Sequence, residues 1–135
     1  MTPKEKDLRL TQLRREHEII WTFETIGARS KTLRKLAENS AATHRASRDR
    51  IRALLIDADQ EPPTPDPGYE SRALVDTEAM QLRAQELLAQ LIQVQLELIP
   101  VGTHTVRAQA IEALSELAIS SVAWGAPAQA FPGLD

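Results

Sequence analysis

The sequence contains no cysteine, which excludes disulfides, thiolate metal ligands and cysteine nucleophiles. It has five glycines in 135 residues, and none forms a dinucleotide-binding, Walker or nucleophile-elbow motif. No apolar run approaches the ~18 residues of a membrane span, and the first residues lack the apolar stretch of a signal peptide. We therefore expect a cytoplasmic protein without a membrane partner or a cofactor.

Aromatic residues are scarce, at 4% of the chain, whereas Ala, Leu, Glu, Gln and Arg dominate. These five are strong helix formers, and a sheet protein would need more β-branched and aromatic residues. A length of 135 residues suits one domain with a sizeable core. The composition therefore predicts a single all-α domain over residues 1–135.

Charge is divided unevenly along the chain. Residues 1–57 hold 13 of the 16 Lys and Arg and 8 of the 19 Asp and Glu, a net charge of +5. Residues 58–135 hold the remaining 3 Lys and Arg and the remaining 11 Asp and Glu, a net charge of −8. The basic half can bind an acidic partner or can pack beside the acidic half of the same chain, and we favour the second interpretation.

Apolar residues recur every three or four positions in four segments, which predicts amphipathic helices at about residues 4–29, 31–57, 75–99 and 103–123. The expected inward stripe of the first helix is Leu13, Glu16, Ile20, Phe23 and Gly27. The expected inward stripe of the second is Leu33, Leu36, Ser40, His44, Ser47, Ile51 and Leu54. The helix-start candidates are Thr2-Pro3, Ser30 or Thr32, Asp76 or Thr77, and Thr103 or Thr105.

The fourth helix has two apolar faces. One face carries Val106, Ala110, Ala113, Leu117 and Ser121, and the other carries Ile111, Leu114, Ala118 and Val122. Because a bundle often buries such a surplus face against a second copy, we expect a homodimer.

Residues 58–74 interrupt the helical pattern and hold four of the eight prolines. Proline cannot continue a helix, and a long connection is unusual inside a compact domain. A long connection is needed, however, if it joins the second and third helices from one end of the bundle to the other, as in ferritin-like folds. The sequence thus predicts a ferritin-like four-helix bundle with a Pro-rich crossover.

Five motifs stand out in order along the chain: Glu16-His17, the run from His44 to Asp49, Glu86, Trp124 and the terminal Ala130-Phe131-Pro132-Gly133-Leu134. Together they resemble a bacterial family described as a ferritin-like domain of unknown function. The similarity covers about Arg14 to Leu134. It implies a four-helix bundle, allows a dimer and supplies no reaction. In the third helix the family carries an aromatic residue where this sequence has Gln93, Val94 and Gln95.

A ferritin-like di-iron site needs two Glu-x-x-His pairs, because that spacing places both ligands on one helix face. No glutamate of this sequence is followed by a histidine at that spacing, so we expect no di-iron centre. A single-metal site is the alternative, because carboxylates with one imidazole can hold Mn, Fe or Zn. Its candidate ligands are Glu16 or Glu24, His44, Glu86 and Glu116.

Four polar residues are expected to form a central cluster: Glu16, His44, Arg48 and Glu86. In the favoured hypothesis, an Arg48–glutamate pair bridged by His44 satisfies the buried charges in place of a metal. In the alternative, Glu16 and His44 perform acid–base chemistry or bind metal. We assign no catalytic residue, because neither a nucleophile nor a substrate pocket is visible in the sequence.

The remaining candidates are a basic helix and the C-terminal tail. Arg29, Lys31, Arg34, Lys35, Arg45, Arg48, Arg50 and Arg52 gather around the second helix. Such a helix can line phosphates, but no helix-turn-helix spacing follows, so we favour a solvated face over nucleic-acid binding.

Trp124 and Phe131 are expected to pack the tail, residues 124–135, onto the bundle. His17 and His104 are expected at the surface or at a helix end. The favoured function is that of a structural or interaction protein.

Overall fold

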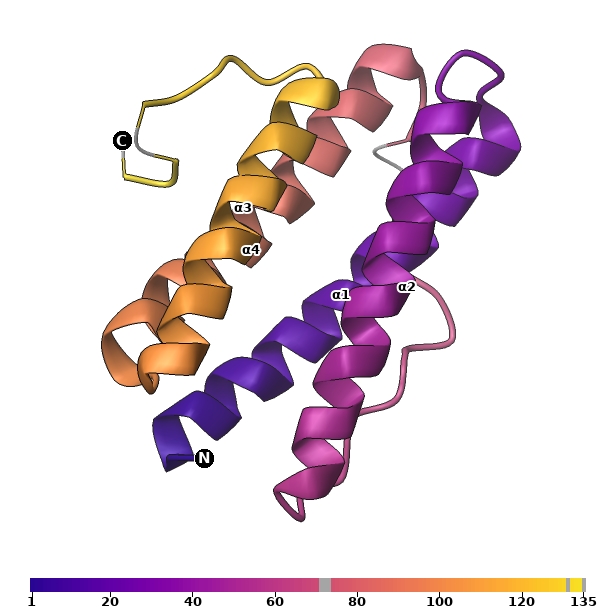
Figure 1. Cartoon of the computed structure of the whole chain (residues 1–135). Helices are drawn as coiled ribbons and strands as arrows, with labels where there is room; N and C mark the ends of the chain where they lie inside the picture. Colours follow the sequence, from indigo (N-terminus) through magenta and orange to yellow (C-terminus); the bar gives the residue numbers. More distant parts are fainter. Residues whose placement is uncertain (71–73, 131, 135) are drawn as a thin grey trace.

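The computed structural model describes residues 1–70, 74–130 and 132–134. These residues form four α-helices and no strand, which confirms the all-α prediction. The helices are α1 (Pro3–Arg29), α2 (Arg34–Asp57), α3 (Thr77–Val101) and α4 (His104–Ala123). They lie roughly along a common axis (Figure 1), as in a four-helix bundle.

Three helices begin at residues whose side chains cap a backbone N–H. The hydroxyl of Thr2 caps α1, the carboxylate of Asp76 caps α3 and the hydroxyl of Thr103 caps α4. Each oxygen accepts a hydrogen bond from the amide three residues later, at 2.8–3.3 Å. Such caps each contribute about 1 kcal/mol, and their short polar side chains made these starts predictable.

Two helix ends differ from the expectation. Helix α2 was expected from about residue 31 but begins at Arg34, because residues 31–33 form a turn. In that turn the hydroxyl of Ser30 accepts the amide hydrogen of Leu33 at 3.1 Å. Helix α3 continues through Pro100 to Val101, since a proline near the end removes one N–H donor but keeps a helical φ.

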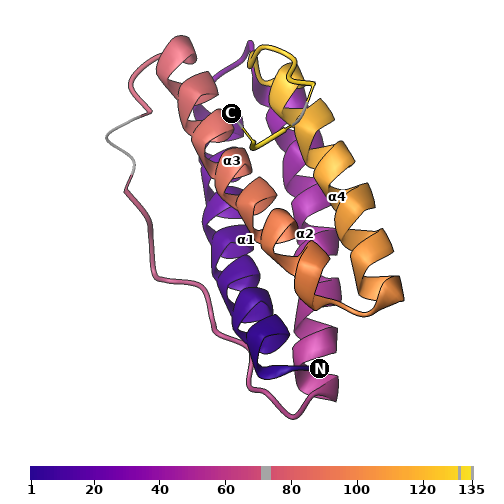
Figure 2. The same ribbon diagram turned by 90° about the vertical axis from the view of Figure 1, so that its left-hand side faces the viewer.

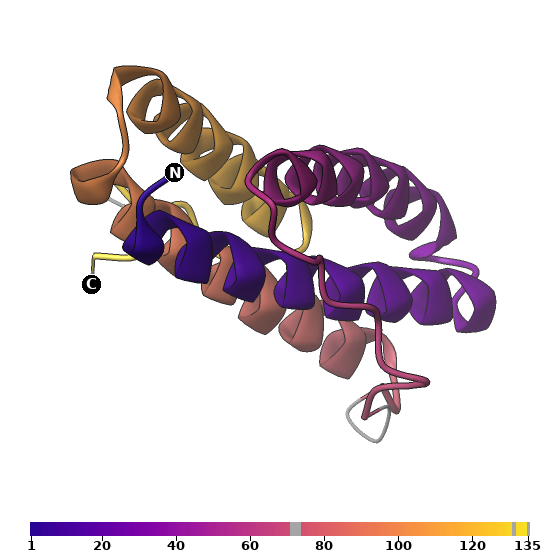
Figure 3. The same ribbon diagram turned by 90° about the horizontal axis from the view of Figure 1, so that it is seen from below.

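The helices form two layers. Seen from below in Figure 3, α2 and α4 lie on the same side of the α1–α3 pair. The extensive contacts join α1 to α2, α1 to α3, and α3 to α4. Helix α4 is therefore an edge helix, with one extensively packed neighbour instead of the two that a closed bundle provides.

The connection between α2 and α3 runs along the bundle from one end to the other (Figure 2), as the prolines predicted. It is held against α1 by His17, whose Nε2 lies 3.0 Å from the carbonyl oxygen of Pro63. The rings of Trp21 and Tyr69 also meet, with centroids 5.8 Å apart. His17 is buried by this contact in the middle of α1, so the expectation that it lies at the surface or at a helix end was wrong.

The apolar core is continuous at one end of the bundle and divides toward the other. The largest cluster includes Phe23, Leu88 and Trp124 and draws on all the helices. Toward the N-terminus of α1, one smaller cluster joins Leu8, Val94, Leu98 and Ala110, and another joins Leu13, Ile51 and Leu55. No helix among the described residues is long and apolar enough to cross a membrane.

Candidate functional site

Glu16 and His44 form a pair in the interior. Both residues lie on inward stripes, Glu16 on α1 and His44 on α2, and these two helices pack along each other. The Nδ1 atom of His44 is 2.9 Å from Oε2 of Glu16, and the two side chains are 6% and 3% exposed. A buried carboxylate needs a hydrogen-bonding partner, and the imidazole supplies it.

Aromatic rings enclose one side of this pair. The ring of Phe23 lies 5.5 Å from that of His44, at a tilt of 49°. Phe23 also stacks on the indole of Trp124, with centroids 5.0 Å apart. The indole Nε1–H donates to the hydroxyl of Ser40 at 3.1 Å, so the fully buried Trp124 has its polar atom satisfied. The end of α4 is thereby joined to both α1 and α2.

Two predicted members of the central cluster lie elsewhere. The guanidinium of Arg48 donates through Nε to Asp49 at 2.9 Å and does not bridge the Glu16–His44 pair. The carboxylate of Glu86 is 63% exposed and accepts from Arg83 at 2.9 Å. The side chains of Arg48 and Glu86 are 29% and 63% exposed, so both reach solvent instead of the interior.

The candidate metal ligands do not converge. Glu16 and His44 meet, but Glu86 and Glu116 are exposed on α3 and α4. Over the residues that the structure describes, no group of three or more His, Asp or Glu side chains is placed to hold a metal ion. Glu24, the alternative to Glu16, is half exposed and accepts from Arg45 at 2.9 Å.

A buried polar stripe on α1 was not recognised from the sequence. Glu5, Arg9 and Gln12 are buried on the face that continues to Glu16. Arg9 donates from Nη1 to Oε1 of Gln12 at 2.9 Å, while its buried Nε lacks a partner among the described residues. Desolvation lowers the pKa of Arg9. The negative charge of Glu5 raises this pKa, and the positive charge of Arg50 lowers it further. Glu5, Arg9, Gln12 and Glu16 follow one another at spacings of four, three and four residues. Because such spacings place side chains on one face of a helix, they could have indicated this stripe in the sequence.

The Pro-rich connection forms a smaller polar contact on the outside of α1. The hydroxyl of Tyr69 accepts the amide hydrogen of Asp66 at 3.1 Å. Desolvation raises the pKa of Tyr69. The hydrogen bond from the Asp66 amide lowers this pKa, whereas the negative charges of Asp66 and Glu18 raise it further. A cavity of about 230 Å³ lies here, between Arg14, Arg15, Glu18 and the connection.

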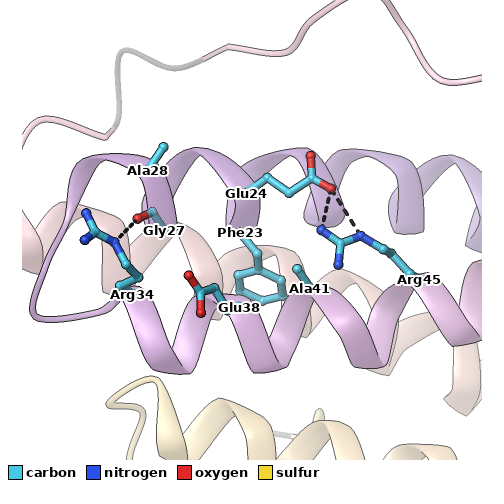
Figure 4. A pocket seen from close by; sticks show the side chains of 8 residues that line it. All are labelled: Phe23, Glu24, Gly27, Ala28, Arg34, Glu38, Ala41 and Arg45. Atoms are coloured by element: carbon cyan, nitrogen blue, oxygen red, sulfur yellow. Dashed lines mark hydrogen bonds and ion pairs between the residues drawn. The ribbon is translucent and has the colours of Figure 1, made fainter.

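A shallow groove between α1 and α2 forms another cavity, with a volume of about 380 Å³. Figure 4 shows Phe23 and Ala41 at its floor, with charged side chains around them. Arg45 donates to Glu24, and Arg34 donates from Nε to the carbonyl oxygen of Gly27 at 2.8 Å (Figure 4). Glu16 and His44 line neither this groove nor the cavity at the Pro-rich connection.

The basic residues of α2 are partly engaged within the chain. Arg34, Arg45 and Arg48 each donate hydrogen bonds to groups of α1 or α2. These three guanidinium groups are therefore not free to follow a phosphate backbone without losing an existing contact. Of the two residues expected to pack the tail, Trp124 is fully buried and Phe131 lies outside the described residues.

Comparisons with known proteins agree with this architecture. A family model for a domain of unknown function, DUF4439, matches residues 9–135. The crystal structure of a conserved hypothetical protein from Mycobacterium tuberculosis superposes with a TM-score of 0.68. That protein is 18% identical, and the alignment covers 95% of this chain and 96% of the other, so the two share a fold. A search of curated protein sequences gives no match.

Proposed function

Because the chain belongs to the family described as a domain of unknown function, DUF4439, we propose its role from the geometry of its interior. Residues 1–135 form a single ferritin-like domain that acts as a structural or interaction module without a metal centre. The end-to-end connection between α2 and α3 supports the ferritin-like assignment, since simple up-and-down bundles use short turns.

The enclosure of the Glu16–His44 pair carries this proposal. A catalytic acid or base must come within hydrogen-bond distance of its substrate. Here the two side chains are at most 6% exposed, and they line neither the α1–α2 groove nor the cavity at the Pro-rich connection. In this setting the hydrogen bond fixes the register of α1 against α2, which is a known use of buried polar groups.

The alternative is a metal-binding or enzymatic ferritin-like protein centred on the same pair. A carboxylate and an imidazole are suitable ligands for Mn, Fe or Zn. A metal between them would need at least one further ligand, and Glu86 and Glu116 would have to turn inward from solvent.

Elemental analysis separates the two functions. Purified protein is incubated with Mn, Fe or Zn, desalted and analysed beside His44→Ala treated in the same way. We expect substoichiometric metal in both proteins, because no third His, Asp or Glu among the described residues is placed to join the pair. One metal per chain that disappears in His44→Ala would overturn the proposed function in favour of the alternative.

We further propose that the partner of this module is a second copy of the chain. The surplus apolar surface of α4 supports this, since large exposed apolar side chains that gather on one helix mark an interaction surface.

A further inference from the structure

Helix α4 buries far less of itself than its composition would lead one to expect. More than half of its 20 residues are apolar, yet Ala110 is the only one of these described residues that is fully buried. Its packed face turns toward α3, where Ala110 joins Leu98 and Leu117 meets the main core. The other apolar residues of α4 divide between half-buried ones that border this face, such as Leu114 and Ala118, and exposed ones farther round the helix.

A second apolar stripe runs along the exposed side of α4. Ile111, Ile119 and Val122 are 49%, 71% and 47% exposed, and the exposed Ser115 lies between them. The spacings of four, four and three residues place these four side chains on one face of the helix. That face is distinct from the one that packs on α3, because Ala110 precedes Ile111 by 100° of helical rotation.

The stripe is arranged symmetrically about Ser115. Ile111 and Ile119 lie four residues to either side of it, and Ala108 and Val122 lie seven residues to either side. If two copies of α4 pack antiparallel, each residue meets the one equally distant from Ser115 in the other direction. Ile111 then faces Ile119 of the partner subunit, and Ala108 faces Val122 of the partner subunit.

We propose that this stripe is the interface of a homodimer, in which the two α4 helices pack antiparallel about a two-fold axis at Ser115. This rests on the proposed function of the chain as an interaction module. A two-fold interface uses the same patch twice, and the symmetric pattern meets that condition. The small serine at the axis permits close approach of the two helices, and each large isoleucine packs beside its counterpart.

The flanking charges predict an unusual response to salt. Glu112 and Glu116 border the stripe on one side, and antiparallel packing brings Glu112 near Glu116 of the partner subunit. These exposed carboxylates repel each other, and added salt screens the repulsion. Association of two copies therefore strengthens with ionic strength, whereas a basic partner attracted by the same glutamates would dissociate.

One helix pair buries less than the roughly 1,600 Å² of a standard interface, so the dimer is weak, with a Kd on the order of 10 μM. Sedimentation equilibrium over a range of concentrations measures this dissociation constant.

Ile119→Glu weakens association about a hundredfold, because the charge enters the two-fold interface twice. Ile56→Glu on α2 is the matched control, since Ile56 is 55% exposed on another helix, and it leaves association unchanged.

Single-cysteine variants test the register, because the chain has no native cysteine. Under mild oxidation Ser115→Cys forms a covalent dimer, and so does a mixture of Ala108→Cys with Val122→Cys. Ala108→Cys alone does not, since its two thiols lie about 20 Å apart in the antiparallel arrangement.

Three results would overturn the interface: a monomer up to millimolar concentration, equal effects of Ile119→Glu and Ile56→Glu, or efficient cross-linking of Ala108→Cys to itself. A stoichiometric metal lost on His44→Ala would instead overturn the proposed function and leave the interface standing.

Discussion

Nδ1 of His44 lies 2.9 Å from the carboxylate of Glu16, in a part of the core where both side chains are nearly inaccessible to water. Each group depends on the other for its hydrogen bond, because burial denies both a water partner. When His44 or Glu16 is replaced, the loss of unfolding free energy therefore depends on whether the new side chain can still form a hydrogen bond with the residue that remains.

This relationship predicts unequal effects of substitution at the two positions. His44→Gln retains an amide that can donate to Glu16, so we expect a loss of unfolding free energy of about 1 kcal/mol or less. Glu16→Ala leaves the imidazole without a partner beside a new cavity, and we expect a loss of about 2–4 kcal/mol. Urea denaturation followed by circular dichroism measures both. Equal losses would contradict a role limited to hydrogen bonding within the core.

Trp124 provides a second prediction, because it joins the end of α4 to two other helices. Trp124→Ala removes the stack on Phe23 and the bond to Ser40, and we expect a loss of about 3–5 kcal/mol. Ser40→Ala removes the hydroxyl alone and costs about 1 kcal/mol. A double-mutant cycle with Trp124→Phe tests the indole–hydroxyl bond, and a coupling energy near zero would show that it contributes nothing to stability.

The sequence predicted the helices well because helical periodicity and capping residues are local signals. All five residues of the stripe from Leu13 to Gly27 are buried, as predicted. On α2 the stripe was displaced, since Leu55 is buried where Leu54 had been expected. Small Ala37 and Ala41 also face the core there, and alanine carries little hydrophobic signal in a sequence.

The candidate site was harder to predict, because pairing between helices depends on their relative rotation. Glu16 and His44 share the interior, but Arg48 is one turn away from His44 and bonds to its neighbour Asp49. A long side chain can turn toward water from the edge of a packed face, and nothing in the local sequence indicates which way it turns. The burial of His17 likewise depends on a connection that starts some 40 residues later.

The buried polar stripe on α1 leads to a third prediction. Arg9 is desolvated and its Nε lacks a partner among the described residues, so its charge lowers the stability of the fold. Replacing buried charges by groups of similar volume is often neutral or stabilising. We expect Glu5→Gln combined with Arg9→Met to be at least as stable as the parent in denaturant. Arg9→Met alone should be less stable than the double variant, because it leaves the Glu5 carboxylate unopposed.

Tyr69 gives the last prediction, on the pH dependence of the Pro-rich connection. Desolvation against α1 raises the pKa of Tyr69 above its ordinary value of about 10. The neutral phenol is therefore favoured in the folded chain, and its contribution to stability is complete below the unfolded pKa. That contribution is lost as the pH rises through the higher folded pKa. Because Tyr69 is the single tyrosine, the ultraviolet absorbance of its phenolate reports this pKa directly.

Two variants serve as controls for this titration. Trp21→Ala removes the ring that packs against the phenol, so the pKa of Tyr69 should fall toward the ordinary value. Tyr69→Phe removes the titrating group, so any loss of thermal stability specific to this pH range should disappear. A phenolate that forms at or below the ordinary pKa in the unmodified protein would show that the connection does not shield Tyr69 from water.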